Sequence, residues 1–387
     1  MKSAKKIATV VASAFISACF FVGCGKAVNV SIGDIMQDID VRPTQEAAYE
    51  EYSKQALKEF FDVAEADGNL LDGEINYDNA AVKAAAIPVA AKLFAYACYN
   101  ERTLNQYVYF SEQEGDTDLG SNGSATAIKQ EYFLRINEQE GVTCGYKYQY
   151  SIKYVDKCDG LISSFKSTFE QARTRIVVDT DQLYRLEGST TSIYVKGRNE
   201  ALGVDLLDCN WKTGSDWGIT DNIELVKGSF IEPGNIKADI EDNAGKDNIT
   251  IRANINILAD NIVKDAIIIK DESEENGLEG YLIVMTIDTE VANKDSASLK
   301  MLRHANGSSN CTWVSEGDDS GLSIMFRIWS NGLFRSYSVS ERWNGKIKGY
   351  SGTADSLTMY YYSYSDNDCD MTPYLKILED AKAAKGN

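Results

Sequence analysis

The first regular pattern along the chain is a run of apolar residues at three- and four-residue steps. Pro43-Thr44 precedes the run and Asp67-Gly68 ends it, and these residue types are typical of helix starts and stops. The apolar positions are Tyr49, Tyr52, Ala56, Phe60 and Ala64. Their spacing predicts an amphipathic helix with one buried face.

An alanine-rich run from about Asn79 to Tyr99 predicts a second helix. Pro88 lies inside the run, and a proline in a helix interior removes a hydrogen bond and clashes with the preceding turn. We therefore expect a buried helix that is kinked or broken near Pro88. Lys83 and Lys92 interrupt the run and alanine contributes little hydrophobicity, which favours a core helix over a membrane span.

Most of the later pattern has the two-residue period of β-strands. The segments with this alternation are Tyr146–Tyr154, Ile249–Ile257, Tyr281–Ile287 and Ser356–Ser363. The polar segment Glu112–Thr126 contains Gly, Ser and Asp and is predicted to be a loop or domain boundary. Thr372-Pro373 is expected to begin a terminal helix that runs over Tyr374–Lys385.

The strongest local signal is the pair Asn331-Gly332 between the apolar segments 322–330 and 333–343. An Asn-Gly pair with both φ angles positive is the favoured two-residue hairpin turn. Strict alternation after this turn places Phe334 on one face with Ser336 and Ser338. The other face then carries Leu333, Arg335, Tyr337 and Val339. The alternation does not indicate which of the two faces is the inner one.

The chain opens with a basic start, Met1 to Lys6, followed by an uncharged apolar run from Ile7 to Val22. This is the pattern of an export signal. The run is shorter than the roughly 20 apolar residues that span a bilayer, which argues against an uncleaved anchor. A plain secretory cleavage remains the main alternative to lipidation.

The end of this segment, Phe21-Val22-Gly23-Cys24, resembles the lipobox of bacterial lipoproteins. The resemblance implies cleavage before Cys24 and a diacylglyceryl group, carrying palmitate-type chains, on the Cys24 thiol. It also implies an extracytoplasmic protein that its N-terminal lipid anchors to the bacterial cell membrane. Two acyl chains give stable attachment where one chain is marginal.

The formal net charge of the chain is −19, and removal of residues 1–23 takes away three lysines and no acidic residue. Such a surface repels phosphate backbones and anionic lipid headgroups, so we expect no nucleic-acid partner. The apolar content of 44% is that of a soluble globular chain. The acidity favours solubility or weak cation binding.

Six cysteines remain after Cys19 leaves with the signal and Cys24 is lipidated, and they are Cys98, Cys144, Cys158, Cys209, Cys311 and Cys369. An even number in an exported chain allows three disulfides, with fifteen possible pairings. Buried thiols are the equal alternative. Neither a CxxC pair nor a Cys/His cluster occurs, so no metal or cofactor site is predicted.

The candidates for catalysis are weak. His304 is the single histidine, and its setting, Arg303 to Gly307, is typical of a polar turn rather than of a catalytic triad. Asp67, Asn69, Asp72 and Glu74 resemble a calcium loop in composition but not in spacing. P-loop, GxGxxG and GxSxG motifs are all missing. We therefore predict no catalytic residue and a protein that is not an enzyme.

Aromatic residues are the remaining lead, with five tryptophans and 22 tyrosines. They can pack a sheet, line a groove for an acyl chain, or stack on sugars. Helices followed by long aromatic strands on an acylated tether loosely resemble the carrier lipoproteins of the LolA and LppX type. That resemblance implies a non-enzymatic binding module for a hydrophobic or glycan ligand.

The sequence thus predicts an α+β fold in which N-terminal helices precede an antiparallel β-sheet, arranged as one or two sheet units. The predicted parts are a signal peptide (1–23), a lipidated tether (24–43), a helical segment (44–110), a β-rich unit (127–235), and a second β-rich unit with a C-terminal helix (245–387). The alternative function is a structural or interaction protein of the cell envelope that docks a protein partner.

Overall fold

A computed structural model gives the fold of the chain. It describes residues 47, 49–104, 106–122, 124–137, 143–155, 168–178, 183–187, 191–194, 218–220, 263–275, 278–294, 312–315, 321–347, 350–365, 369–370 and 372–386. The predicted signal peptide, the tether with Cys24, the strand at Ile249–Ile257 and the turn around His304 lie outside these residues.

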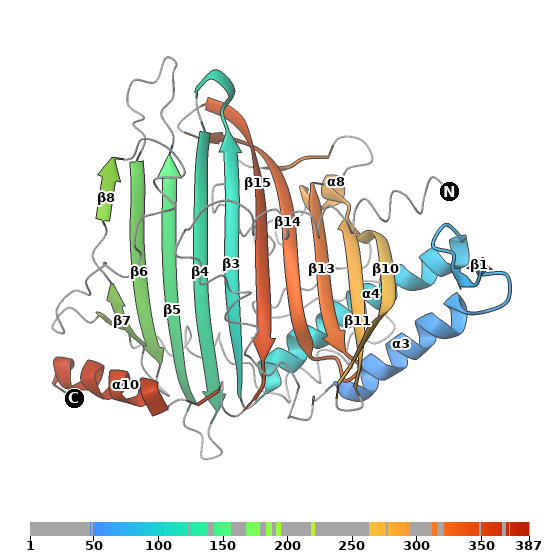
Figure 1. Cartoon of the computed structure of the whole chain (residues 1–387), viewed down its shortest axis with the longest axis horizontal. Coiled ribbons are helices and arrows are strands. Elements are labelled where there is room, and N and C mark those ends of the chain that lie inside the picture. The colour runs from blue at the N-terminus through green and yellow to red at the C-terminus, as the bar shows by residue number, and fades with distance from the viewer. Residues whose placement is uncertain are drawn as a thin grey trace.

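The fold is α+β, with N-terminal helices followed by an antiparallel sheet, as the sequence predicts (Figure 1). The helical elements are α3 (Glu50–Ala64), α4 (Ala80–Thr103), the short 3-10 helix η1 (Gly120–Asn122), α8 (Thr289–Ala292) and α10 (Thr372–Lys385). A small hairpin of β1 (Leu70–Leu71) and β2 (Glu74–Ile75) joins α3 to α4.

The remaining described strands form one sheet. They are β3 (Gln106–Asp118), β4 (Ser124–Asn137), β5 (Thr143–Val155), β6 (Thr168–Val178), β7 (Leu183–Glu187), β8 (Thr191–Tyr194), β9 (Gly218–Thr220), β10 (Val263–Glu275), β11 (Leu278–Ile287), β12 (Thr312–Trp313), β13 (Leu322–Trp329), β14 (Phe334–Ile347) and β15 (Tyr350–Ser363). The order along the sheet is β10-β11-β13-β14-β15-β3-β4-β5-β6-β7-β9, while β12 pairs with β14 and β8 with β6.

Strands from both predicted β-rich parts therefore meet in one sheet. The junction is the pair β15 and β3, which are antiparallel from Thr353 opposite Asp118 to Ser363 opposite Val108. Figure 1 shows this junction near the middle of the sheet, between β14 and β4. The first and last thirds of the chain thus lie side by side there.

The two long helices cover one face of the β10–β14 side of the sheet, which we call the inner face. Phe60 of α3 and Phe94 of α4 are buried together with inward residues of the strands, such as Ile283 and Phe326. The ring centroids of Phe94 and Phe326 lie 5.3 Å apart. This layer of helix on sheet is the hydrophobic core, because each element buries its apolar face against the other.

The two helix predictions are confirmed with corrections. In α3 the predicted face is buried at Tyr49, Ala56 and Phe60, but Tyr52 is exposed. Helix α4 begins at Ala80, directly after Asn79, whose side chain accepts a hydrogen bond from the N–H of Ala81, and it continues through Pro88 without a break. Among the described residues, α4 is the one helix long and apolar enough to cross a membrane, and half of that window is buried within the protein.

The predicted loop at Glu112–Thr126 is wrong for most of its length. Residues 106–118 form β3, which pairs with β15 on one side and β4 on the other, and residues 124–137 form β4. The helical segment accordingly ends at Thr103, before the predicted boundary at residue 110. Polar composition does not prevent a strand from forming when both of its edges are hydrogen-bonded.

The hairpin around Asn331-Gly332 is confirmed, but its turn differs from the prediction. Trp329 N–H donates to the carbonyl of Leu333, and Gly332 N–H donates to that of Trp329. Gly332 has φ of 81°, whereas Asn331 is not among the described residues with positive φ. This is a three-residue loop with a bulge at Gly332 rather than a two-residue turn.

A second bulge changes the faces of β14. Arg327 pairs with Ser336 but the next residue, Ile328, pairs with Phe334, so Arg335 is an extra residue in the ladder. Phe334 therefore lies on the inner face with Tyr337, and their ring centroids are 5.2 Å apart. The prediction that groups Phe334 with Ser336 is wrong, because strict alternation fails at a bulge.

The other predicted strands and the terminal helix are found near their predicted positions. Tyr146–Tyr154 lies in β5, Tyr281–Ile287 lies in β11, and Ser356–Ser363 lies in β15. In β11 the four predicted apolar positions, Tyr281 to Ile287, are all buried. Helix α10 begins at Thr372 and contacts β6 (Figure 1).

Candidate functional site

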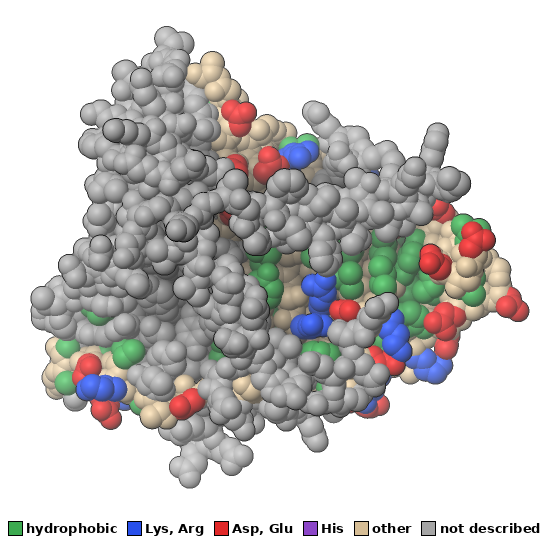
Figure 2. Space-filling view, viewed as in Figure 1, with side chains coloured by type: hydrophobic (Ala, Val, Ile, Leu, Met, Phe, Trp, Pro, Cys, Tyr) green, Lys and Arg blue, Asp and Glu red, His purple; other side chains and the backbone are tan. Residues whose placement is uncertain are grey.

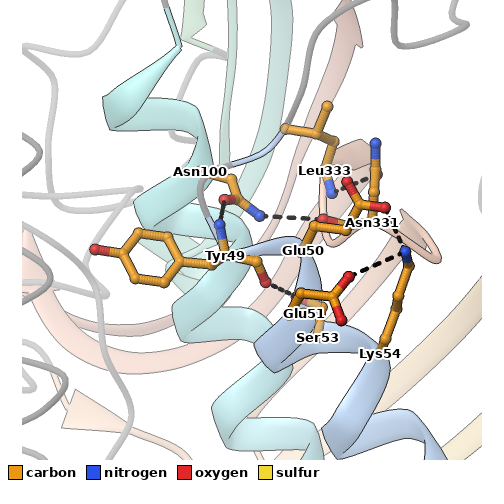
Figure 3. Close-up of polar contacts among 8 residues, drawn as sticks. All are labelled: Tyr49, Glu50, Glu51, Ser53, Lys54, Asn100, Asn331 and Leu333. Atoms are coloured by element: carbon orange, nitrogen blue, oxygen red, sulfur yellow. Dashed lines mark hydrogen bonds and ion pairs between the residues drawn. The ribbon is translucent and has the colours of Figure 1, made fainter.

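Asn100, near the end of α4, is fully buried and joins three elements (Figure 3). Its side-chain oxygen accepts a hydrogen bond from Tyr49 N–H at 2.8 Å. Its Nδ2 donates to the carbonyl oxygens of Gly332 at 3.1 Å and Asn331 at 3.4 Å. The side chain thus connects the start of α3 to the β13–β14 turn, and its bonds to three backbone groups indicate a structural joint rather than a binding site.

The loop between α3 and α4 uses its polar residues for its own backbone. Asp72 and Gly73 have φ of 55° and 85°, which makes the β1–β2 connection a two-residue turn with both φ angles positive. Asn69 donates to the carbonyl of Val63 and accepts from the side chain of Asn79. Two of the four residues that resemble a calcium loop, Asn69 and Asp72, thus have a role in the loop itself.

Within the part of the chain that the structure describes, no group of three or more His, Cys, Asp or Glu residues is placed to hold a metal ion. The side chain of Cys98 is half-buried on α4, and Cys369 is buried just before α10.

Aromatic rings gather on the inner face beside the end of α4. Tyr337 of β14 stacks on Tyr360 of β15, with centroids 4.2 Å apart and planes 17° apart. Tyr360 also meets Tyr109 of β3 edge to face at 5.8 Å. Tyr360 and Tyr109 are only partly buried, so the outer end of this row keeps some exposed ring surface.

Glu101 of α4 holds the neighbouring tyrosines. One carboxylate oxygen accepts from the hydroxyl of Tyr107 at 3.2 Å, and the other accepts from Tyr362 at 3.1 Å. Burial raises the pKa of Tyr362 well above its usual value, and the Glu101 carboxylate raises it further. Burial likewise raises the pKa of Tyr337, with a smaller contribution from Tyr360. The hydroxyls therefore stay protonated and available as donors.

Next to these rings lies a band of small or polar residues, which we call the inner strip: Ser111 and Gly115 of β3, Glu341 of β14, and Ser356 and Thr358 of β15. Ladder pairs place Glu341 opposite Ser356, and Ser356 opposite Gly115. The four polar residues are all buried. Hydrophobic residues usually fill such inward positions, so a band of buried polar groups is unusual for a sheet.

Glu341 is the charged member of the inner strip and is 2% exposed. Its carboxylate accepts a hydrogen bond from Trp313 Nε1 at 3.1 Å and another from the Ser356 hydroxyl at 3.4 Å. Trp313 stacks on Trp343 with centroids 5.2 Å apart, and the two tryptophans are Cα partners across β12 and β14. The inner strip therefore has tryptophan rings at one end and tyrosine rings at the other.

Thr358 differs from the other polar residues of the inner strip in the state of its hydroxyl. It is 3% exposed, and its buried hydroxyl forms no hydrogen bond with any residue that the structure describes. Leaving a buried hydroxyl unsatisfied costs about 1–3 kcal/mol. Such a group in a folded protein calls for an explanation, which is often a bound water, ion or ligand.

Gly115 is the one member of the inner strip without a side chain. Of the described atoms, a Cβ placed on Gly115 would meet Ser356 Cβ at 3.4 Å and the Asp355 carbonyl at 3.5 Å, both ordinary contacts. Gly352 of β15 differs, since a Cβ there would lie 2.4 Å from the Asp118 carbonyl. A small side chain thus fits at Gly115, and large rings flank the inner strip.

The opposite face of the sheet carries a different surface. Figure 2 shows hydrophobic side chains gathered over β10 and β11, with basic side chains next to them. Ladder pairing and partial exposure assign Ile267, Ile269, Leu282, Val284 and Met325 to this patch. At its border Arg327 and Arg335 face Asp271 at 3.7 and 3.6 Å. We call this surface the outward patch.

No family model matches the chain, and no curated protein matches it. Among solved structures, the chain is similar to a β-barrel-like protein of domain of unknown function DUF1849 from Brucella abortus, at 11% identity and a TM-score of 0.25, covering 68% of this chain and 99% of that one. The translocator domain of the autotransporter NalP from Neisseria meningitidis matches at 8% identity and a TM-score of 0.13, covering 71% and 98%. Similarities this low support no conclusion about function.

Proposed function

We propose that the protein is a membrane-anchored extracytoplasmic lipoprotein that acts as a non-enzymatic binding module for a hydrophobic or glycan ligand. One observation supports the binding role above all. The inner face of β14, β15 and β3 carries buried polar groups between a pair of tryptophans and a row of tyrosines. Ligand sites combine apolar and aromatic walls with a few polar groups that fix orientation.

The residue types of the inner strip suit binding better than catalysis. Glu341 accepts hydrogen bonds from Trp313 and Ser356, so its carboxylate is held in place as an acceptor. A hydrolase acting through carboxylates needs two of them at a defined separation across the scissile bond. The inner strip contributes a single carboxylate, Glu341, beside hydroxyls and rings.

The test is direct binding to the mature protein, measured by calorimetry with neutral oligosaccharides and with palmitate. Tyr360→Ala removes a partly exposed ring from the edge of the inner strip and should weaken binding about tenfold or more, equivalent to roughly 1.4 kcal/mol. Tyr52→Ala is the matched control, because Tyr52 is 39% exposed on α3, in a different part of the molecule. If both variants lost the same amount of binding affinity and melted at the same temperature, the result would contradict the proposal.

The outward patch favours the alternative, an envelope protein that docks a partner. Ile269 is 37% exposed beside half-exposed apolar neighbours, and contiguous apolar patches with a charged border often mark protein contacts. Ile269→Lys would disrupt such a contact and leave ligand binding at the inner strip unchanged. Loss of a copurifying envelope protein in this variant, together with absence of ligand binding by wild type, would favour the alternative.

A further inference from the structure

The unpaired hydroxyl of Thr358 indicates what kind of ligand the inner strip accepts. Thr358 Oγ1 is buried and has no hydrogen-bond partner in the described part of the chain. An acyl chain lying on this face would leave the hydroxyl unsatisfied, since hydrocarbon can neither donate nor accept a hydrogen bond. A ligand with its own hydroxyl groups would satisfy it. The inner face therefore favours a polar ligand over a fully apolar one.

Glu341 and Ser356 are two further polar residues of the inner strip that favour a polar ligand. Thr358 and Ser356 are two residues apart on β15, which places them about 6.6 Å apart on the same face. Ser356 is opposite Glu341, whose buried carboxylate is an acceptor for ligand hydroxyls and repels a ligand carboxylate or phosphate. Gly115 lies opposite Ser356 and completes the row, with no side chain of its own between Ser356 and a ligand.

We infer that the inner strip binds a neutral sugar, with Thr358 and the Glu341–Ser356 pair hydrogen-bonded to its hydroxyls and the nearby rings packed against its faces. This inference rests on the proposed binding function and narrows it to neutral oligosaccharides. A site built to hydrogen-bond a ligand discriminates strongly against one that lacks the matching groups, because its own polar atoms are then left unpaired.

The decisive variant is Thr358→Val, which removes the hydroxyl and keeps the branched shape. Its matched control is Thr289→Val, since Thr289 is similarly buried at 4% exposure but donates to the Val314 carbonyl at 2.9 Å. Without ligand, Thr358→Val should melt at or above the wild-type temperature and Thr289→Val below it. With neutral oligosaccharides of glucose, galactose, mannose and N-acetylglucosamine, Thr358→Val should bind about tenfold more weakly or worse, while Thr289→Val should bind normally.

A second variant tests whether the ligand lies against Gly115, whereas Thr358→Val tests the hydrogen bond of the Thr358 hydroxyl. Gly115→Ala adds a methyl group that would meet Ser356 Cβ at 3.4 Å, an ordinary contact, so the protein should fold and oligosaccharide binding should weaken. Neither the Thr358 nor the Gly115 variant should lower the melting temperature of the free protein as much as Thr289→Val does. A loss of sugar binding in these two variants would therefore come from a lost ligand contact and not from unfolding.

Several results would overturn the inference. Wild type that binds palmitate but none of the sugars would refute it and leave the proposed binding function standing. Wild type that binds neither probe would refute both. Unchanged sugar affinity in Thr358→Val would show that its hydroxyl contacts no ligand. A melting temperature for Thr358→Val as low as that of Thr289→Val would mean that the hydroxyl already has a structural partner.

Discussion

At the scale of single residues, Gly332 and Asn100 show how one contact decides a local structure. A Cβ on Gly332 would lie 2.1 Å from Ser53 Oγ and 2.9 Å from Asn100 Nδ2. The turn therefore approaches α3 and α4 so closely that only glycine fits. Asn100 also donates to the carbonyls of Asn331 and Gly332, which holds this turn against the end of α4.

Gly332→Ala should therefore lower the free energy of unfolding by about 2–4 kcal/mol, from the positive φ and from the clash with Ser53. Gly68→Ala is the matched control, because Gly68 has φ of 89° but no described atom lies within 4 Å of the added Cβ. It should cost about 1 kcal/mol. Denaturant melts of both variants test this prediction, and equal losses would mean that packing against α3 contributes nothing.

At the scale of elements, the sequence predicted several strands with one polar and one apolar face, such as β5 and β11, and missed others, among them β3, which lacks such a contrast. Strand β11 alternates between half-buried and buried positions, so its period is visible in the chain. Strand β3 has Glu114 and Asp116 on one face and Ser111 and Gly115 on the other, so it shows no hydrophobic period. Ladder bonds to β15 and β4 hold it in the sheet, and one sequence does not reveal long-range pairing.

One of the missed strands, β3, carries part of the candidate site. Prediction from local sequence fails most often where polar residues occupy inward positions, as they do at functional sites. Strand β3 has such a residue at Ser111. One signal was available in β14, where Glu341 falls between Val339 and Trp343 on the inward side of the alternation. A charged residue at an inward position marks a buried polar site. Thr358 gave no such signal, because threonine is common in strands whether or not its hydroxyl is bonded.

At the scale of the whole molecule, one sheet connects the N-terminal helices to the C-terminal strands, and buried tyrosines lie where they meet. The hydroxyl of Tyr77 donates to the Ile268 carbonyl on β10, while Tyr362 and Tyr364 hydrogen-bond to Glu101 and to the carbonyl of Phe334. These hydroxyls link α4 and its preceding loop to β10, β14 and β15. Their protonation state therefore affects the stability of the whole core.

Stability should fall steeply in alkali for this reason. Burial raises the pKa of Tyr77 to about 12 and that of Tyr337, Tyr362 and Tyr364 well above the ordinary value. Unfolded tyrosine has a pKa of about 10, so the unfolded state loses its protons first. The resulting stability is fully present below about pH 10 and is lost as pH rises toward the folded values. Denaturant melts from pH 8 upward, with tyrosinate absorbance, test this, and an unfolding free energy that stays level well above pH 10 would contradict it.

The last prediction concerns where the molecule is held. We expect Cys24 to be the acylated N-terminus, because the basic start, the apolar run and the Gly23-Cys24 junction coincide in the sequence. Cys24→Ala should move the protein from the detergent phase to the aqueous phase, since the loss of two acyl chains removes stable attachment. Cys19→Ala is the matched control, because Cys19 leaves with the signal and its loss should change nothing. The intact mass of the N-terminal peptide identifies the modification directly. An unmodified Cys24, or cleavage at another position, would contradict lipid anchoring and favour a secreted binding module.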